Sequence, residues 1–242
     1  MIGDRGRIFH QQQLVTALLH TMSTSSLSHP IIRRSLPLWI LMMGHVFAAL
    51  FLKNLGVGVD QIDDPQVMSV AHLFSKIHHL LVFWVAPFAL AFIAFLQIEL
   101  IRGKSAGWGI DLIGGLLTFR CLVIFLMLNL LLLSHLKAGG LLLMQLILFI
   151  PVITIDFGWI YWRLDSAARL KGRSHIRFDE GMGELDTFDY YHASAMTLLQ
   201  FEPSGAKPTS RLMKTLFVIH GAMMLDLVAL TLSRAIGLAS AG

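Results

Sequence analysis

Long apolar runs, separated by short polar segments, fill most of residues 38–236. Each run holds roughly 18–25 residues, which lets an α-helix rising 1.5 Å per residue cross about 30 Å of hydrocarbon. We predict five spanning helices on this basis: Leu38–Leu55, His79–Leu100, Asp111–Leu133, Gly140–Trp162 and Leu212–Ile236. The pattern predicts an all-α fold, a polytopic membrane helix bundle.

The composition agrees with a membrane protein and excludes several other classes. Charged residues make up only 14% of the chain, against about 25% in soluble domains, and the mean hydropathy is +0.69. Cys121 is the only cysteine, so an intrachain disulfide or a thiolate metal cluster cannot form. No glycine-rich nucleotide loop and no nucleophile–base motif is present, so we do not expect an enzyme.

The basic residues cluster before the first predicted span, after the second and after the fourth. These are Arg5, Arg7, Arg33 and Arg34, then Arg102 and Lys104, then Arg163, Arg169, Lys171, Arg173 and Arg177. With five spans, all three segments lie on one side of the membrane. Because cytoplasmic loops are enriched in Lys and Arg, we predict a cytoplasmic N-terminus and attraction to anionic lipid rather than to nucleic acid.

A polar segment of a different kind precedes the last span. An amphipathic run, DYYHASAMTLL, begins at Asp189 and is too short to cross a bilayer, and QFEPSGAKPTSR follows it. Such a helix followed by a polar hairpin is typical of a re-entrant loop, which is tolerated at membrane depth only where protein or a water-filled cavity surrounds it. We therefore predict a short re-entrant helix before the last spanning helix. It enters from the cytoplasmic side if there are five spans, and from the opposite side if that count is off by one.

Residues 138–242 resemble the two-helix pore domain of the potassium-channel superfamily. Tyr190 and Tyr191 open the short helix, Pro208 follows the loop, and Gly140–Trp162 and Leu212–Ile236 correspond to the outer and inner helices. The sequence is even more similar to an uncharacterised family of bacterial inner-membrane proteins with a filterless pore loop. Three short motifs carry that similarity: Met196-Thr197, Thr209-Ser210-Arg211 and His220-Gly221. The resemblance implies an inner-membrane location and a homo-oligomer, a tetramer if it forms a pore.

The loop departs from that family at the place of the selectivity filter. Leu199–Gly205 reads LQFEPSG instead of a glycine-rich filter, and a string of inward-pointing carbonyls needs glycine conformations. Potassium selectivity is therefore not expected. The candidate pore residues are Thr197, Gln200, Glu202 and Asp226, with a ring of Glu202 side chains attracting cations. The alternative is a permanently closed pore in which Glu202 only terminates a loop.

Ionisable residues inside the predicted spans form a second candidate group. Arg120 lies near the middle of the third span, and Asp156 lies in the fourth. Each costs roughly 2.5–3.5 kcal/mol at the bilayer centre unless it is paired or hydrated. We expect an intramembrane charge pair, Arg120 with Asp156 or with Asp226. A structural pair and a proton or ion path both remain open.

Histidines form the third group. His45 and His220 lie inside spans and are the candidates for binding haem or a metal ion, although no pair has the spacing of a known metal motif. Histidines that only form hydrogen bonds are the alternative, and no cofactor is expected on that interpretation. Pro87 and Pro151 also fall inside spans, where they predict kinks.

Three regions follow from these assignments: an N-terminal cytoplasmic or interfacial segment (1–36), spanning helices one to three (37–137) and a pore-domain-like hairpin (138–242). Residues 1–21 form either an interfacial helix or, if translation starts at Met22, no part of the protein. Three functions remain open. They are an ion-channel-like pathway, a haem or metal electron-transfer subunit, and an accessory subunit of a larger membrane complex.

Overall fold

The computed structural model describes residues 30–52, 59–60, 62–102, 107–132, 139–179, 185–200 and 205–240. The chain divides into two compact units, Met1–Leu36 and Pro37–Gly242. The packing of helices and strands described here lies within the second unit. Residues 1–21 and Glu202 lie outside the described residues.

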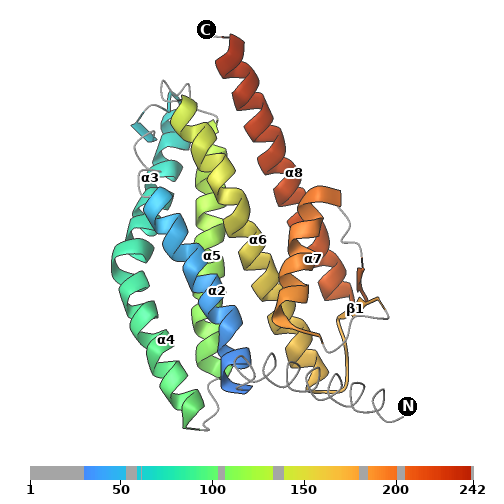
Figure 1. The fold of residues 1–242 in the computed structure, drawn as a ribbon. Coiled ribbons are helices and arrows are strands. Elements are labelled where there is room, and N and C mark those ends of the chain that lie inside the picture. Colours follow the sequence, from blue (N-terminus) through green and yellow to red (C-terminus); the bar gives the residue numbers. More distant parts are fainter. Residues whose placement is uncertain are drawn as a thin grey trace, which may run out of the picture. The chain divides into compact units, whose positions relative to one another are not determined.

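Helices account for most of the described chain, and two very short strands complete it (Figure 1). The elements are α2 (Pro30–Phe51), α3 (Pro65–Leu80), the π-helix η2 (Leu81–Val85), α4 (Ala86–Ile101), α5 (Gly107–Leu132), α6 (Gly139–Arg169), β1 (Ile176–Phe178), α7 (Thr187–Gln200), β2 (Ala206–Pro208) and α8 (Arg211–Ser240). The prediction of a predominantly helical fold is confirmed.

Within the described ranges, three helices are long and apolar enough to cross a membrane: Gly107–Leu131, Gly140–Arg169 and Arg211–Ala239. The bent pair Pro65–Phe83 and Ala86–Glu99 is a fourth if it counts as one span. The apolar part of α2, Ser35–Phe51, is shorter than these. The helices therefore support a membrane protein, whereas the count of five spans stays a prediction.

The second predicted span, His79–Leu100, is the later part of a longer bent helix that begins at Pro65. Its two halves meet at 42° around η2. Pro87 lies just after this break and has no N–H to donate, and the N–H of Ala86 reaches back five residues to the carbonyl of Leu81. A missing donor combined with a π-type register explains why the helix bends here.

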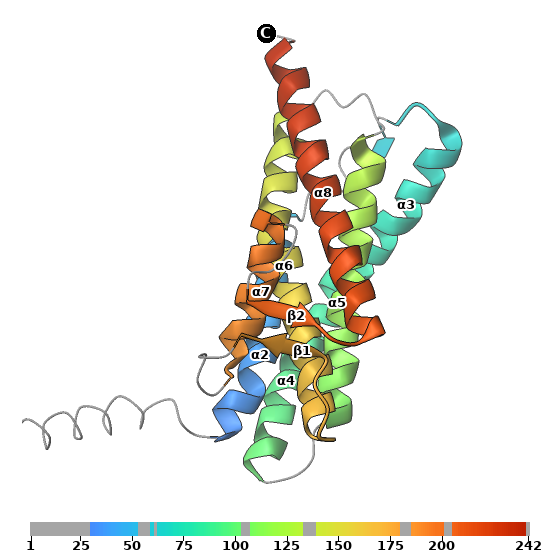
Figure 2. The ribbon, with the colours of Figure 1, turned by 90° about the vertical axis from the view of Figure 1, so that its right-hand side faces the viewer.

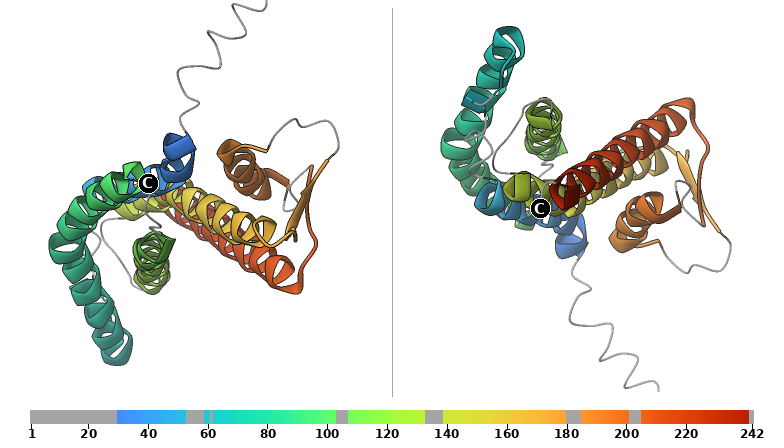
Figure 3. Two further views of the ribbon diagram at one scale, coloured as in Figure 1. Left: turned by 90° about the horizontal axis from the view of Figure 1, so that it is seen from below. Right: turned by 90° about the horizontal axis from the view of Figure 1, so that it is seen from above.

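The axis of the bundle is α6, which contacts α5, α7 and α8. Viewed along the helices, α7 and α8 lie on opposite flanks of α6, and the bent helix lies away from both of them (Figure 3). Gly114 allows the close approach of α5 and α6, because a Cβ atom there would lie 1.9 Å from the indole of Trp159. The core is formed by side chains from both helices, with Ile124, Leu128 and Phe149 fully buried.

Basic residues gather toward one end of the bundle. Figure 1 shows that α4 ends, α5 begins and α6 ends toward the lower end of that view. Arg102 follows α4 there, and Arg163 on α6 forms a two-pronged ion pair with Asp111 on α5, with Nη2 and Oδ2 2.8 Å apart. The grouping matches the arrangement expected for the basic segments after the second and fourth predicted spans.

Candidate functional site

The segment between α6 and α8 leaves one end of the bundle and returns to the same end. Strands β1 and β2 pair in antiparallel register, with Ile176 opposite Pro208 and Phe178 opposite Ala206 (Figure 2). All of α7 lies between these two strands in the sequence. The chain that carries α7 is therefore closed at its base by a two-stranded clasp.

Helix α7 runs antiparallel to α6 and reaches the middle of it. The Tyr190 hydroxyl donates to Asp165 near the end of α6, whereas the Ser194 hydroxyl donates to the carbonyl of Thr154 at 2.7 Å. Thr154 lies 15 residues from either end of α6. Since α7 has only 14 residues, about 21 Å at 1.5 Å per residue, it extends along roughly half of its neighbour.

A glycine on α6 allows this contact. A Cβ atom at Gly158 would lie 2.4 Å from the ring of Tyr191, closer than any side chain tolerates. The hydroxyl of the same tyrosine donates to the carbonyl of Pro37 on α2 at 3.0 Å. Tyr191 thus fixes α7 between two neighbouring helices.

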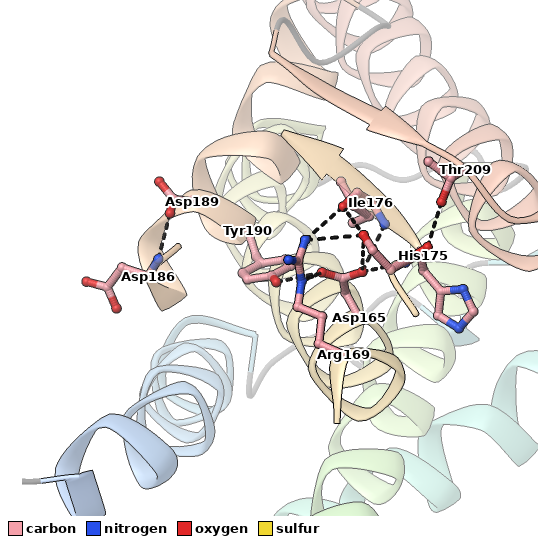
Figure 4. A network of polar contacts seen from close by, with 9 residues as sticks. Asp165, Arg169, His175, Ile176, Asp186, Asp189, Tyr190 and Thr209 are labelled. Atoms are coloured by element: carbon pink, nitrogen blue, oxygen red, sulfur yellow. Dashed lines mark hydrogen bonds and ion pairs between the residues drawn. The ribbon is translucent and has the colours of Figure 1, made fainter. Parts of the chain in front are cut away.

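The base of α7 is held by a hydrogen-bond network around Asp165, whose side chain is completely buried (Figure 4). One carboxylate oxygen accepts from the backbone N–H groups of His175 and Ile176 at 2.6 and 2.9 Å. The other accepts from Arg169 Nε at 2.5 Å and from the Tyr190 hydroxyl at 2.7 Å. One carboxylate therefore connects the end of α6, strand β1 and the start of α7.

Two further contacts tie the network to β1 and to the residue that follows β2. Arg169 donates from Nη2 to the carbonyl of Ile176 at 3.0 Å, and the hydroxyl of Thr209 donates to the carbonyl of Ser174 at 2.8 Å. Burial, together with the neighbouring Asp165 carboxylate, raises the pKa of the Tyr190 hydroxyl, so it stays protonated and donates its hydrogen bond. The clasp and the network together set where α7 begins.

Of the four predicted pore residues, the structure describes the side-chain surroundings of Thr197 and Asp226. Thr197 is fully buried and its hydroxyl bonds to the Ala193 carbonyl in its own helix. Gln200 ends α7, and Glu202 lies outside the described residues. Asp226 is half-buried on α8, and its Oδ2 atom has no hydrogen-bond partner among the described residues.

Arg120, Asp156 and His45 come together in the interior. Arg120 Nη1 lies 3.2 Å from His45 Nδ1 and donates to the His45 carbonyl at 2.8 Å. The other ring nitrogen, His45 Nε2, lies 3.0 Å from Asp156 Oδ2. All three side chains are almost completely buried. The expected partners Arg120 and Asp156 are therefore linked through the imidazole of His45, for which the sequence left metal binding and hydrogen bonding open.

The two ring nitrogens of His45 face different partners. A guanidinium only donates hydrogen bonds, so Nδ1 is the acceptor in the contact with Arg120. Nε2 faces the carboxylate of Asp156. The imidazole therefore stands between the arginine and the aspartate inside the bundle.

His220 lies in a separate aromatic group. Its ring stacks on Phe157 with the centroids 4.0 Å apart, and its Nδ1 lies 3.0 Å from the Tyr161 hydroxyl. Over the described ranges, no group of three or more His, Cys, Asp or Glu side chains is arranged to hold a metal ion. The geometry brings His45 and His220 into different environments and gives no support for a shared metal.

Several residues of the site were missed in the sequence analysis, chiefly Asp165, Arg169 and Gly158. Arg169 follows Asp165 by four residues on one helix face, a spacing that could have shown that the helix continues beyond Trp162. Gly158 gave no comparable signal, because only the position of Tyr191 explains it.

Comparisons of the chain with models of protein families, with curated proteins and with solved structures gave no match.

Proposed function

We propose that residues 138–242 form a pore-domain-like hairpin in which α7 enters the bilayer halfway and returns, and that copies of this hairpin surround a cation path without potassium selectivity. The observation that carries the proposal is the position of α7. Its Ser194 lies beside the midpoint of α6, a helix long enough to cross the membrane. The clasp of β1 and β2 brings both ends of the segment that carries α7 to the same end of the bundle.

The burial of α8 supports assembly into an oligomer. Only 22% of the most apolar stretch of α8 is buried within the chain, against 44% of the corresponding stretch of α6. Its exposed apolar side chains include Val218, Leu225 and Leu232. On this proposal, part of that surface contacts other copies and part contacts lipid, with the loop after α7 near the common axis.

The test is cation flux into liposomes that contain the purified protein. Glu202→Gln removes the proposed ring of charge without changing side-chain size, and Glu180→Gln, in the preceding linker, is the matched control. We expect about tenfold lower flux for Glu202→Gln, equivalent to about 1.4 kcal/mol of lost cation attraction, and unchanged flux for Glu180→Gln. Equal flux in all three proteins, or no flux above that of empty liposomes, contradicts the proposal.

Mass measurement of the intact protein in mild detergent gives an independent check of the assembly. Four copies are expected for a pore of this type. A single copy that co-purifies with fixed, different membrane subunits would instead support the accessory-subunit alternative. A Soret absorption band in the same sample would support the electron-transfer alternative.

A further inference from the structure

A cavity of about 220 Å³ lies between α2, the bent helix and α5, away from α7 and α8. It adjoins the π-helix break, and Leu81 and Val82 of η2 form part of its wall. π-Helical segments inside α-helices are frequent at functional sites. A molecule bound in this cavity would therefore contact the π-helix break.

The floor and the rim of the cavity differ in chemistry. Buried residues form the floor, and Arg120 and His45 are its charged or titratable members. Exposed apolar residues form the rim, with Leu50 on α2 and Pro87 and Leu90 on α4. A ligand that fits both regions has a polar head and an apolar body.

The polar head must accept hydrogen bonds. Arg120 uses Nη1 for its contacts with His45, and its Nε and Nη2 atoms have no hydrogen-bond partner within the described part of the chain. Arg120 is 2% exposed, so water does not cover this edge as it would at a surface. Leaving buried donors unsatisfied costs roughly 1–3 kcal/mol per group, and more when the group is charged.

The free edge has the geometry that recognises a carboxylate. Nε and Nη2 present parallel N–H groups, the fork that binds both oxygens of a carboxylate at once. Asp156 does not occupy this edge, because it lies on the far side of the His45 ring. An anion that bound here would displace none of the contacts of the cluster.

We propose that this cavity binds a single-chain amphiphile with a carboxylate head, of the fatty-acid class, with the head on the free edge of Arg120 and the chain leaving between Leu50 and Leu90. The volume favours one chain, because cavities for larger ligands are usually about 300–1,000 Å³. The apolar rim offers no polar partner to a bulky hydrated headgroup, which argues against a phospholipid head.

The experiment uses the full-length protein in lipid nanodiscs and dodecanoic acid that carries a photoreactive diazirine on its chain. Illumination followed by peptide mass spectrometry should find the label on α2 and α4, near Leu50 and Leu90. Excess unlabelled dodecanoate should compete, whereas its methyl ester and dodecanol should compete about tenfold more weakly or worse, because they lack the charged, two-oxygen head.

Two variants and a control separate binding from folding. Arg120→Gln should weaken labelling about tenfold to hundredfold, the effect of losing a charge-assisted hydrogen-bond pair. Ala49→Phe fills the cavity while keeping Arg120, and it should reduce labelling to a similar extent. Ala94→Phe adds the same ring at an exposed position of α4 outside the cavity and should label as the wild type does.

If Arg120→Gln does not fold, Ala49→Phe decides the question. The proposal is overturned if the wild type is not labelled at these helices or if Ala49→Phe labels like the wild type. It is also overturned if the methyl ester competes as well as the acid. None of these outcomes depends on cation flux, so the proposal and the pore-like function can fail separately.

Discussion

At the scale of single residues, two buried charged groups organise the second unit in different ways. Asp165 has its oxygens filled by backbone, arginine and tyrosine donors, so it acts as a structural centre for the turn after α6. Arg120 keeps two nitrogens without a partner among the described residues. A buried charged group whose hydrogen bonds are all made is expected to have a structural role. A buried charged group with unpartnered donors next to a cavity is expected to bind a ligand.

The saturated centre predicts a large stability effect. Asp165→Asn removes the charge that Arg169 pairs with and places amide donors against other donors, so we expect a loss of about 3 kcal/mol, as for breaking a buried ion pair. Asp179→Asn is the control, since Asp179 lies 3.8 Å from Lys207 and both side chains are well exposed. Unfolding in mixed micelles measures the free energy of unfolding of both variants. Similar losses in the two would show that the Asp165 network stabilises the protein no more than an exposed ion pair does.

The Arg120 cluster predicts a coupled loss. Arg120→Gln and Asp156→Asn each leave one charge buried without compensation, so each should cost about 3 kcal/mol. The double variant leaves no such charge, so its loss should fall below the sum of the two by at least about 1 kcal/mol. The same unfolding assay measures the cycle, and additive losses would mean that the two charges do not compensate each other through His45.

At the scale of elements, the position of α7 depends on how closely it packs on α6. The contact of Gly158 with Tyr191 and the bond from Ser194 to Thr154 hold α7 along half of α6. Neither contact involves a charged residue. The depth that α7 reaches is therefore set by shape, whereas its base is set by the polar network of Asp165.

This packing predicts that alanine has opposite effects on stability at two glycines of α6. Alanine is favoured over glycine inside a helix by up to about 1 kcal/mol, and nothing lies within 4 Å of a Cβ atom at Gly140. Gly140→Ala should therefore keep or raise stability. Gly158→Ala should lower it by about 1–3 kcal/mol, because the new methyl group overlaps the Tyr191 ring. Thermal unfolding compares the two, and a stabilised Gly158→Ala protein would rule out the close contact.

Some elements could be predicted from local pattern and others could not. The predicted helices over 111–133 and 212–236, and the amphipathic run that begins at Asp189, end within a few residues of α5, α8 and α7, since continuous apolar or amphipathic runs define them. The predicted end of α6 at Trp162 was seven residues too early. Arg163, Asp165 and Arg169 make those last turns look like a loop, and only long-range partners show that Asp165 is buried.

At the scale of the whole molecule, the sequence could not show which residues far apart in the chain come into contact. His45 and Arg120 are 75 positions apart, and Asp165 and Tyr190 are 25 positions apart on different helices. Arg120, Asp156 and His45 could each be recognised singly from the sequence, because ionisable groups in apolar runs are costly. His45 could not be joined to the charge pair on that basis, because metal binding and charge compensation look alike until the contacts are known.

The account of the C-terminal hairpin depends on the depth that α7 reaches in a bilayer. The most direct measurement is the depth of spin labels at Phe188, Ala195 and Lys207, introduced singly as cysteines in a Cys121→Ser protein in lipid vesicles. We expect the labels at 188 and 207 to lie near the surface on the same side and the label at 195 to lie near the bilayer centre. Labels at 195 and 207 that both lie in bulk water, or labels at 188 and 207 on opposite sides, would contradict it.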